Sequence, residues 1–78
     1  MLNKPAESIK GRAAVTNLKL RMWKKRLSGK ALAELVGTSQ QLINKYENGE
    51  VMPRPERIAQ LRECVGRTLY FKQPKETL

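Results

Sequence analysis

Three residues with a fixed spacing constrain the fold of this 78-residue chain more than any other feature of its sequence. Ala33 is followed four residues later by Gly37 and ten residues later by Ile43. The segments 29–36 and 40–47, on either side of the glycine, both have the length and apolar periodicity of short helices. A small residue lets two helices approach closely, a glycine permits the backbone to reverse, and a branched aliphatic side chain fills the wedge. The spacing therefore predicts a helix-turn-helix.

Capping residues set the limits of these two helices. Ser28 is a suitable N-cap for the first, and Gly37 suits the position that follows its last residue. Either Ser39 or Thr38 caps the second helix, and the dipeptide at 48–49 ends it. Helices this short are marginal alone, so we expect both to pack on neighbouring elements.

A further helix is expected on the N-terminal side of this pair. Across residues 13–26, Val15, Leu18 and Met22 recur at the spacing of one helical face. Trp23 widens this apolar stripe, so we expect its side chain to lie in the core or to be half-buried.

A fourth helix follows the pair and is expected to start at Pro55 and to end at Gly66, with Cys64 buried on it. The next residues, 67–71, form either a short helix or a strand that pairs with a second copy of the chain. Three side chains in this segment either close the core or make a dimer contact: Leu69, Tyr70 and Phe71. We therefore expect an all-α fold, a compact bundle of four to five short helices, with a C-terminal strand under the second alternative.

Length and composition indicate one domain. We expect a flexible basic arm at 1–12, a folded domain at 13–71 and a tail at 72–78. The single cysteine excludes an intrachain disulfide, which suits a reducing cytoplasm. No apolar run approaches the roughly 18 residues of a membrane span, so we expect no membrane association.

The charge of the chain points to an anionic partner. The formal net charge is +9, from 16 Lys and Arg against 7 Asp and Glu. Residues 1–30 hold nine of these cations and only one acid, so most of the excess lies before the helix pair.

One face of the second helix of the pair is free of structural roles. It carries four polar side chains: Gln40, Gln41, Asn44 and Lys45. A helix fits the DNA major groove, and an amide can pair with both N6 and N7 of adenine. The face therefore predicts sequence-specific recognition of double-stranded DNA. Leu42 lies beside it and either touches a thymine methyl group or packs beneath the loop near Val51 and Met52.

The sequence offers few residues that could support catalysis or metal binding. The chain contains no histidine, and its carboxylates are spread without an obvious pair. We expect neither an enzyme nor a bound cofactor or metal ion.

The stretch from Leu27 to Gly66, "LSGKALAELVGTSQQLINKYENGEVMPRPERIAQLRECVG", resembles the phage repressor and Cro family of DNA-binding domains, the Xre-type helix-turn-helix family. This resemblance implies a bundle of four or five helices that binds operator DNA as a dimer. It implies base reading by Gln40, Gln41 and Asn44, with Lys45 at a base or a phosphate. It further implies DNA-backbone contacts at Ser28, Gly29, Lys30, Ser39, Asn48, Gly49 and Arg54.

Two positions depart from the family pattern. The family usually has glutamine where this chain has Gly29, so the contact expected there is reduced to the backbone N–H. The family also pairs the glutamate at Glu47 with an arginine on the first helix, where direct counting gives Met22 and places Arg21 one residue early. Either the turn after the first helix is one residue longer here, or Glu47 has another cation as its partner.

The leading hypothesis is a DNA-binding transcriptional regulator, a repressor that binds a palindromic operator as a homodimer. A second is an antitoxin-type protein whose C-terminal segment binds a small protein partner and which autoregulates through the same domain. A third is a sequence-blind polyanion binder that uses the basic arm and the first helix.

Overall fold

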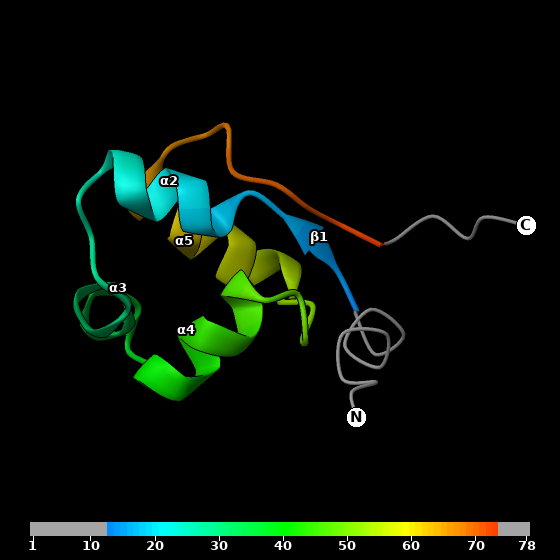
Figure 1. The fold of residues 1–78 in the computed structure, drawn as a ribbon, viewed down its shortest axis with the longest axis horizontal. Coiled ribbons are helices and arrows are strands. Elements are labelled where there is room, and N and C mark those ends of the chain that lie inside the picture. The colour runs from blue at the N-terminus through cyan, green and yellow to red at the C-terminus, as the bar shows by residue number, and fades with distance from the viewer. Residues whose placement is uncertain (1–12, 74–78) are drawn as a thin grey trace, which may run out of the picture.

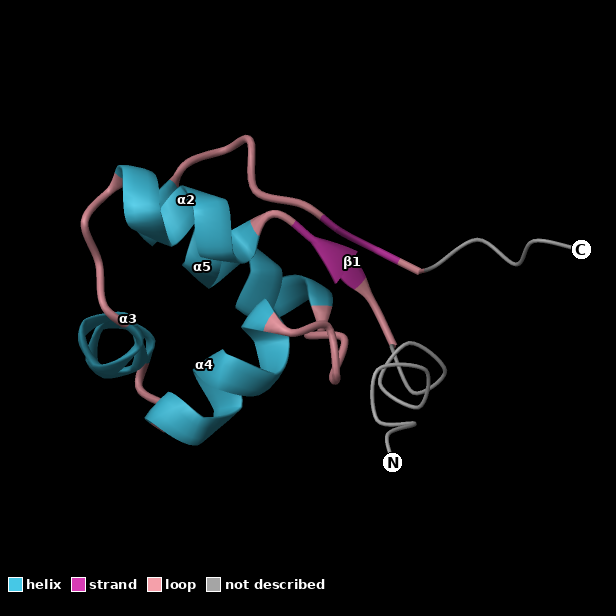
Figure 2. Cartoon of the chain, in the orientation of Figure 1, coloured by secondary structure: helices cyan, strands magenta, loops and turns pink. Residues whose placement is uncertain are grey.

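The computed structural model describes residues 13–73, so the predicted arm at 1–12 and the end of the tail at 74–78 lie outside the described residues. Four helices form a bundle, and a two-stranded antiparallel sheet lies beside it (Figures 1 and 2). The elements in chain order are β1 (Val15–Thr16), α2 (Leu18–Lys24), α3 (Gly29–Val36), α4 (Gln40–Glu47), α5 (Pro55–Val65) and β2 (Phe71–Lys72). The expectation of a compact all-α bundle is confirmed, with the small sheet added.

Local capping places α3 and α4 at the predicted residues. The Ser28 hydroxyl accepts a hydrogen bond from the backbone N–H of Ala31 at 3.0 Å. Ser39, and not Thr38, caps α4, because its hydroxyl accepts from the N–H of Leu42 at 3.1 Å. Each cap satisfies one of the N–H groups that a helix start leaves without an internal acceptor.

The turn between α3 and α4 depends on Gly37. Its backbone is left-handed, with φ 75° and ψ 41°, and its N–H donates to the carbonyl oxygen of Ala33. A side chain at Gly37 would meet no neighbour within 4 Å, so backbone conformation and not space favours glycine here.

The core gathers side chains from all four helices and from the C-terminal segment. The six largest side chains that are less than 2% exposed are Leu18, Leu32, Ile43, Leu61, Leu69 and Val65. Ala33 is 3% exposed and Tyr46 5%, so both lie in the interior, Ala33 as the sequence predicted. Cys64 is only half-buried and packs against the edge of this core.

The predicted helix over 13–26 is wrong in its first third, because the chain is extended at Val15–Thr16 and becomes helical only at Leu18. The Thr16 hydroxyl accepts from the N–H of Leu18 at 3.1 Å and donates to the carbonyl oxygen of Tyr70 at 2.7 Å. The Asn17 amide donates to the carbonyl oxygen of Thr68 and accepts from the N–H of Tyr70. These bonds hold the segment against the C-terminal end of the domain and prevent an earlier start of the helix.

Trp23 is exposed, contrary to the expectation that it is core or half-buried: 75% of its surface is accessible. The core face of α2 is set by Leu18 and Met22, which are 0% and 5% exposed. Trp23 comes five residues after Leu18, about 140° around a helix of 3.6 residues per turn, so it points outward.

The strand alternative holds for the C-terminal segment, but the strand pairs within the same chain. β2 runs antiparallel to β1, with Phe71 opposite Thr16 and Lys72 opposite Val15. Leu69 and Phe71 are 1% and 9% exposed, so these two side chains close the core. The Phe71 ring also meets Tyr46 of α4 edge-on, with ring centroids 6.1 Å apart.

Leu69→Ala tests whether this segment belongs to the core. We expect the free energy of unfolding to fall by about 2–5 kcal/mol, because the change removes buried methyl groups and leaves a cavity. The loss should be the same at low and high protein concentration in urea denaturation. Leu20→Ala, at a position 50% exposed, is the matched control and should have little effect. A loss that depends on protein concentration would instead place Leu69 in a contact between two copies.

Candidate nucleic-acid interface

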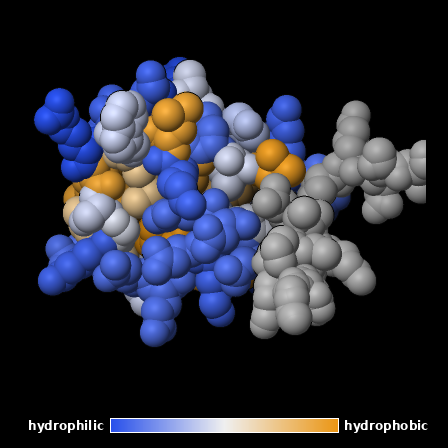
Figure 3. All heavy atoms as spheres, in the orientation of Figure 1, coloured by the Kyte–Doolittle hydropathy of each residue, from blue (hydrophilic) through white to orange (hydrophobic). Residues whose placement is uncertain are grey.

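The outer face of α4 presents the four polar side chains that the sequence singled out. Gln40, Gln41, Asn44 and Lys45 are all exposed. Within residues 13–73, no side-chain hydrogen bond of the fold engages their amide or ammonium groups. Figure 3 shows a largely hydrophilic surface over this helix. The inner face is occupied by Ile43 and Tyr46, so the helix is divided cleanly between core and solvent.

The exposed side chains of α4 fall into two rows. A Cβ atom added at Gly29 would lie 3.6 Å from Gln40 Cγ, from Asn44 Oδ1 and from Glu47 Oε2. This row, with its members four and three residues apart, therefore borders the start of α3. Gln41 and Lys45, four residues apart, form a second row farther around the helix.

The start of α3 lies next to the first row and makes the surface continuous across both helices. Lys30 and Ser28 are exposed, and Gly29 is partly exposed. The N–H groups of Gly29 and Lys30 occupy the first two helical positions, where no acceptor exists within the helix. Gly29 has no side chain, which leaves room for Gln40 and Asn44 beside the start of α3. The glutamine that the family usually has at this position would lie between these two side chains and the start of α3.

At the far end of α4, two of the residues expected to contact the DNA backbone are exposed and one is buried. Asn48 and Arg54 are exposed, and the side chain of Arg54, the N-cap residue of α5, makes no capping hydrogen bond to this helix. Gly49 is buried, its N–H donates to Tyr46, and its carbonyl oxygen accepts from Ala13 and Ala14 at 2.7 and 3.0 Å. The expectation that Gly49 contacts DNA is therefore corrected, because the fold already uses both of its backbone groups.

Leu42 follows the second of its two alternatives. It is partly buried and packs against the core, as do Val51 and Met52 of the following loop. Its apolar surface is thus largely used within the protein.

The arginine that the family pattern suggested for Glu47 is engaged elsewhere. Arg21 Nε donates to the carbonyl oxygen of Val65 at 3.0 Å, on the α5 side of α2. Burial raises the pKa of the Glu47 carboxyl above its ordinary value of 4.5, and the positive charge of Lys19 acts in the opposite direction. Sequence reasoning missed Lys19, because nothing in a pattern of apolar residues shows which cation of an amphipathic helix faces another helix.

Glu47→Gln tests this electrostatic arrangement. Because the pKa of Glu47 is raised by folding, the stability that comes from its protonation is complete below 4.5 and is lost as pH rises through the folded pKa. We therefore expect the glutamine variant to melt at a higher temperature than the wild type at neutral pH. The difference should close as pH falls below 4.5, which circular dichroism melting curves over a pH series would measure. Glu34→Gln, at an exposed position of α3, is the matched control. An unchanged or lower melting temperature at neutral pH would contradict this account of Glu47.

The two capped helices, the turn at Gly37 and the exposed polar face of α4 define a helix-turn-helix domain of the type that binds DNA. Residues 18–71, more than half of the chain, match the HTH_3 helix-turn-helix family of Cro/C1-type domains, and the chain belongs to this family. It is a DNA-binding transcriptional regulator, and no catalytic family matches it. No curated protein and no solved structure matches the chain at a significant level.

Two further observations concern the described residues alone. None of the helices between residues 13 and 73 has the length and apolar character needed to cross a membrane. The same residues contain no group of three or more histidine, cysteine or acidic side chains placed to hold a metal ion.

Proposed function

We propose that the chain is a repressor that binds a palindromic operator as a homodimer, with α4 of each copy in the major groove. The observation that carries the proposal is the set of four unengaged polar side chains on the outer face of α4. A helix inserted in this way reads base edges with the residues near its N-terminus. The two copies would place their α4 helices about 34 Å apart, one turn of the duplex.

The two rows of α4 would have different surroundings in the groove. Gln41 and Lys45 project away from α3, so they reach base edges without contact to the rest of the protein. Gln40 and Asn44 border Gly29, so their amides read bases next to the DNA strand that the start of α3 approaches. The backbone contacts would then come from Ser28, Gly29, Lys30, Ser39, Asn48 and Arg54.

A selection of binding sites from random duplexes tests the proposal as a whole. We expect a short inverted repeat, and the same repeat should occur upstream of the chain's own gene if the protein represses its own synthesis. Scrambling one half of the selected site should weaken binding strongly, because a dimer then loses half of its base contacts. Recovery of no motif would end the proposal, and equal affinity for half and whole sites would end its dimeric form.

The antitoxin-type alternative gains no support from the fold. It needs the C-terminal segment to grip a partner, but Leu69 and Phe71 lie in the core of the same chain. Tyr70 is half-buried, and Lys72 Nζ lies over its ring, 5.1 Å from the centroid. A small protein that co-purifies with the chain and stays bound after nuclease treatment would support this alternative.

Gln41→Ala should relax the choice of base at one or two positions of each half-site. A good bidentate amide contact contributes about 1–3 kcal/mol of discrimination, so the preferred base should lose most of its advantage there. Binding to a panel of single-base variants of the operator measures this effect. Gln60→Ala removes an exposed glutamine from α5 and should leave the panel unchanged. Equal base preferences in Gln41→Ala and the wild type would show that Gln41 does not read a base.

Lys30→Ala should weaken binding to operator and random duplexes alike. A phosphate contact carries no sequence information, and its loss should reduce the slope of log affinity against log salt by about 0.9. Titrations at several salt concentrations measure the slope. Lys72→Ala, on the strand at the opposite end of the molecule from α3 (Figure 1), is the matched control. A loss confined to the operator, with an unchanged slope, would contradict a phosphate contact at Lys30.

A further inference from the structure

Trp23 is a large aromatic side chain that the fold does not use. It is the only tryptophan of the chain, and three quarters of its surface is exposed. The neighbouring Leu20, one turn earlier on α2, is half exposed. An exposed indole of this kind marks a contact surface, because burying its apolar ring against a partner is favourable.

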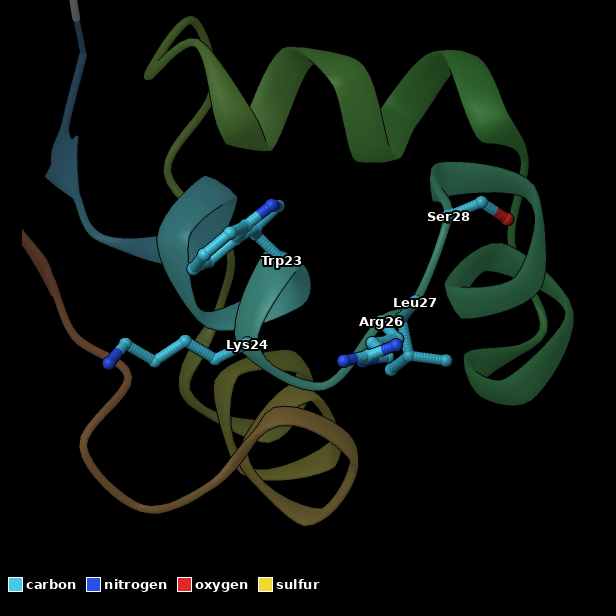
Figure 4. A pocket seen from close by; sticks show the side chains of 5 residues that line it. All are labelled: Trp23, Lys24, Arg26, Leu27 and Ser28. Atoms are coloured by element: carbon cyan, nitrogen blue, oxygen red, sulfur yellow. The ribbon is translucent and has the colours of Figure 1, made fainter.

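The surface around Trp23 continues into the proposed DNA-binding edge. Trp23 lines an open hollow of about 660 Å³ together with Lys24, Arg26, Leu27 and Ser28 (Figure 4). Trp23 and Lys24 extend to opposite sides of α2, Arg26 and Leu27 belong to the loop after it, and Ser28 opens α3. The hollow therefore joins α2 to the start of α3, where backbone contacts are proposed.

Lys19 shows which way this side of α2 faces. It precedes Trp23 by four residues, so both lie on one side of the helix. The charge of Lys19 acts on Glu47, and Glu47 Oε2 lies close to Gly29 at the start of α3. The side of α2 that carries Trp23 is thus turned toward the junction of α3 and α4.

The charges around the hollow select an anionic occupant. Lys24 and Arg26 line the hollow, Lys25 lies between them in the chain, and no acid occurs between residues 18 and 28. Placing a second copy on this surface would bring two such helices together, with repulsion between like charges. DNA supplies both the negative charge and the apolar sugar faces that an indole can cover.

The backbone at Arg26 determines where its side chain lies. Arg26 has φ 58°, in the left-handed region, and it is the one residue other than glycine with positive φ among the described residues. Glycine adopts this conformation without strain, whereas arginine does not. This conformation ends α2, because the N–H groups of Arg26 and Leu27 donate to the carbonyl oxygens of Trp23 and Met22. The turn places the guanidinium of Arg26 at the border of the hollow, beside Trp23.

We propose that Trp23 is a further DNA contact, which packs its indole on the sugar–phosphate backbone beside the site of Ser28, with Arg26 at a neighbouring phosphate. The indole N–H donates to a phosphate oxygen, and the ring covers a deoxyribose. This contact rests on the proposed DNA binding and adds affinity without adding sequence information.

The single tryptophan makes the contact directly measurable in the full chain. Tryptophan fluorescence should be quenched, and access of acrylamide to Trp23 should fall several-fold, when the wild type is saturated with the selected operator duplex. A random duplex at low salt should give the same protection. If the wild type binds the duplex while acrylamide access stays unchanged, Trp23 does not touch DNA, and the proposed function stands without it.

Substitutions separate the indole from the charges around it. Trp23→Ala should weaken binding to operator and random duplexes by about tenfold, the effect of losing one hydrogen bond to a charged group. The salt slope should stay unchanged, because no charge is removed. Leu35→Ala, which removes an exposed leucine near the C-terminal end of α3, is the matched control and should bind within twofold of the wild type. Wild-type affinity in Trp23→Ala would overturn the proposal.

Arg26→Gly should raise the melting temperature and at the same time weaken binding, with a smaller salt slope. If Arg26→Gly is more stable than the wild type but binds DNA with unchanged affinity, Arg26 is not part of the contact. Protection of Trp23 by an acidic protein, but not by DNA, would show that the surface belongs to a protein partner and would overturn the proposal. Failure of the wild type to bind any duplex would instead refute the proposed function itself.

Discussion

Packing of α3 against α4 determines the geometry of the interface. Ile43 is fully buried in the wedge between these helices, and Ala33 is small enough to let them approach. Gly37 makes the reversal possible, because its left-handed backbone turns the chain within three residues. As Ile43 points inward, helical periodicity forces Gln41 and Asn48 outward. The reading face is therefore a consequence of the core contact and not a separate feature of the surface.

The small sheet supports this arrangement from the other side. β2 pairs with β1, and Phe71 at the start of β2 meets Tyr46 on the inner face of α4. Asn17 and Thr16 add side-chain bonds to the backbone of the C-terminal segment. The segment after α5 is thus part of the DNA-binding domain, and it braces α4 against the remainder of the bundle.

The net charge of +9 overstates the cations that are free to meet DNA. Arg21 donates to the carbonyl oxygen of Val65, at the end of α5, and Arg57 Nη1 donates to that of Val36 at 2.9 Å, at the end of α3. Arg62 Nε donates to the carbonyl oxygen of Leu69 at 3.0 Å. Two of these three arginines occupy carbonyl groups that helix ends leave open, where a positive charge also suits the helix dipole. Their guanidinium groups therefore hold the fold, and the lysines carry most of the remaining attraction for a polyanion.

The sequence by itself determined the limits of α3, α4 and α5 and the outward direction of Gln40, Gln41, Asn44 and Lys45. The reason is that the residues at the helix ends act on groups only a few positions away: Ser28, Gly37, Ser39 and Pro55. The helical period then determines which side chains point outward.

Only the tertiary structure decided where α2 begins, which strand Phe71–Lys72 joins, that Arg21 bonds Val65, and that Trp23 faces solvent. Each of these depends on groups far apart in the chain, such as Thr16 with Tyr70 and Arg21 with Val65. The apolar pattern at Val15, Leu18 and Met22 fits two structures equally well. One is a single continuous helix, and the other is a strand followed by a shorter helix. Hydrogen bonds to residues more than fifty positions away chose between them.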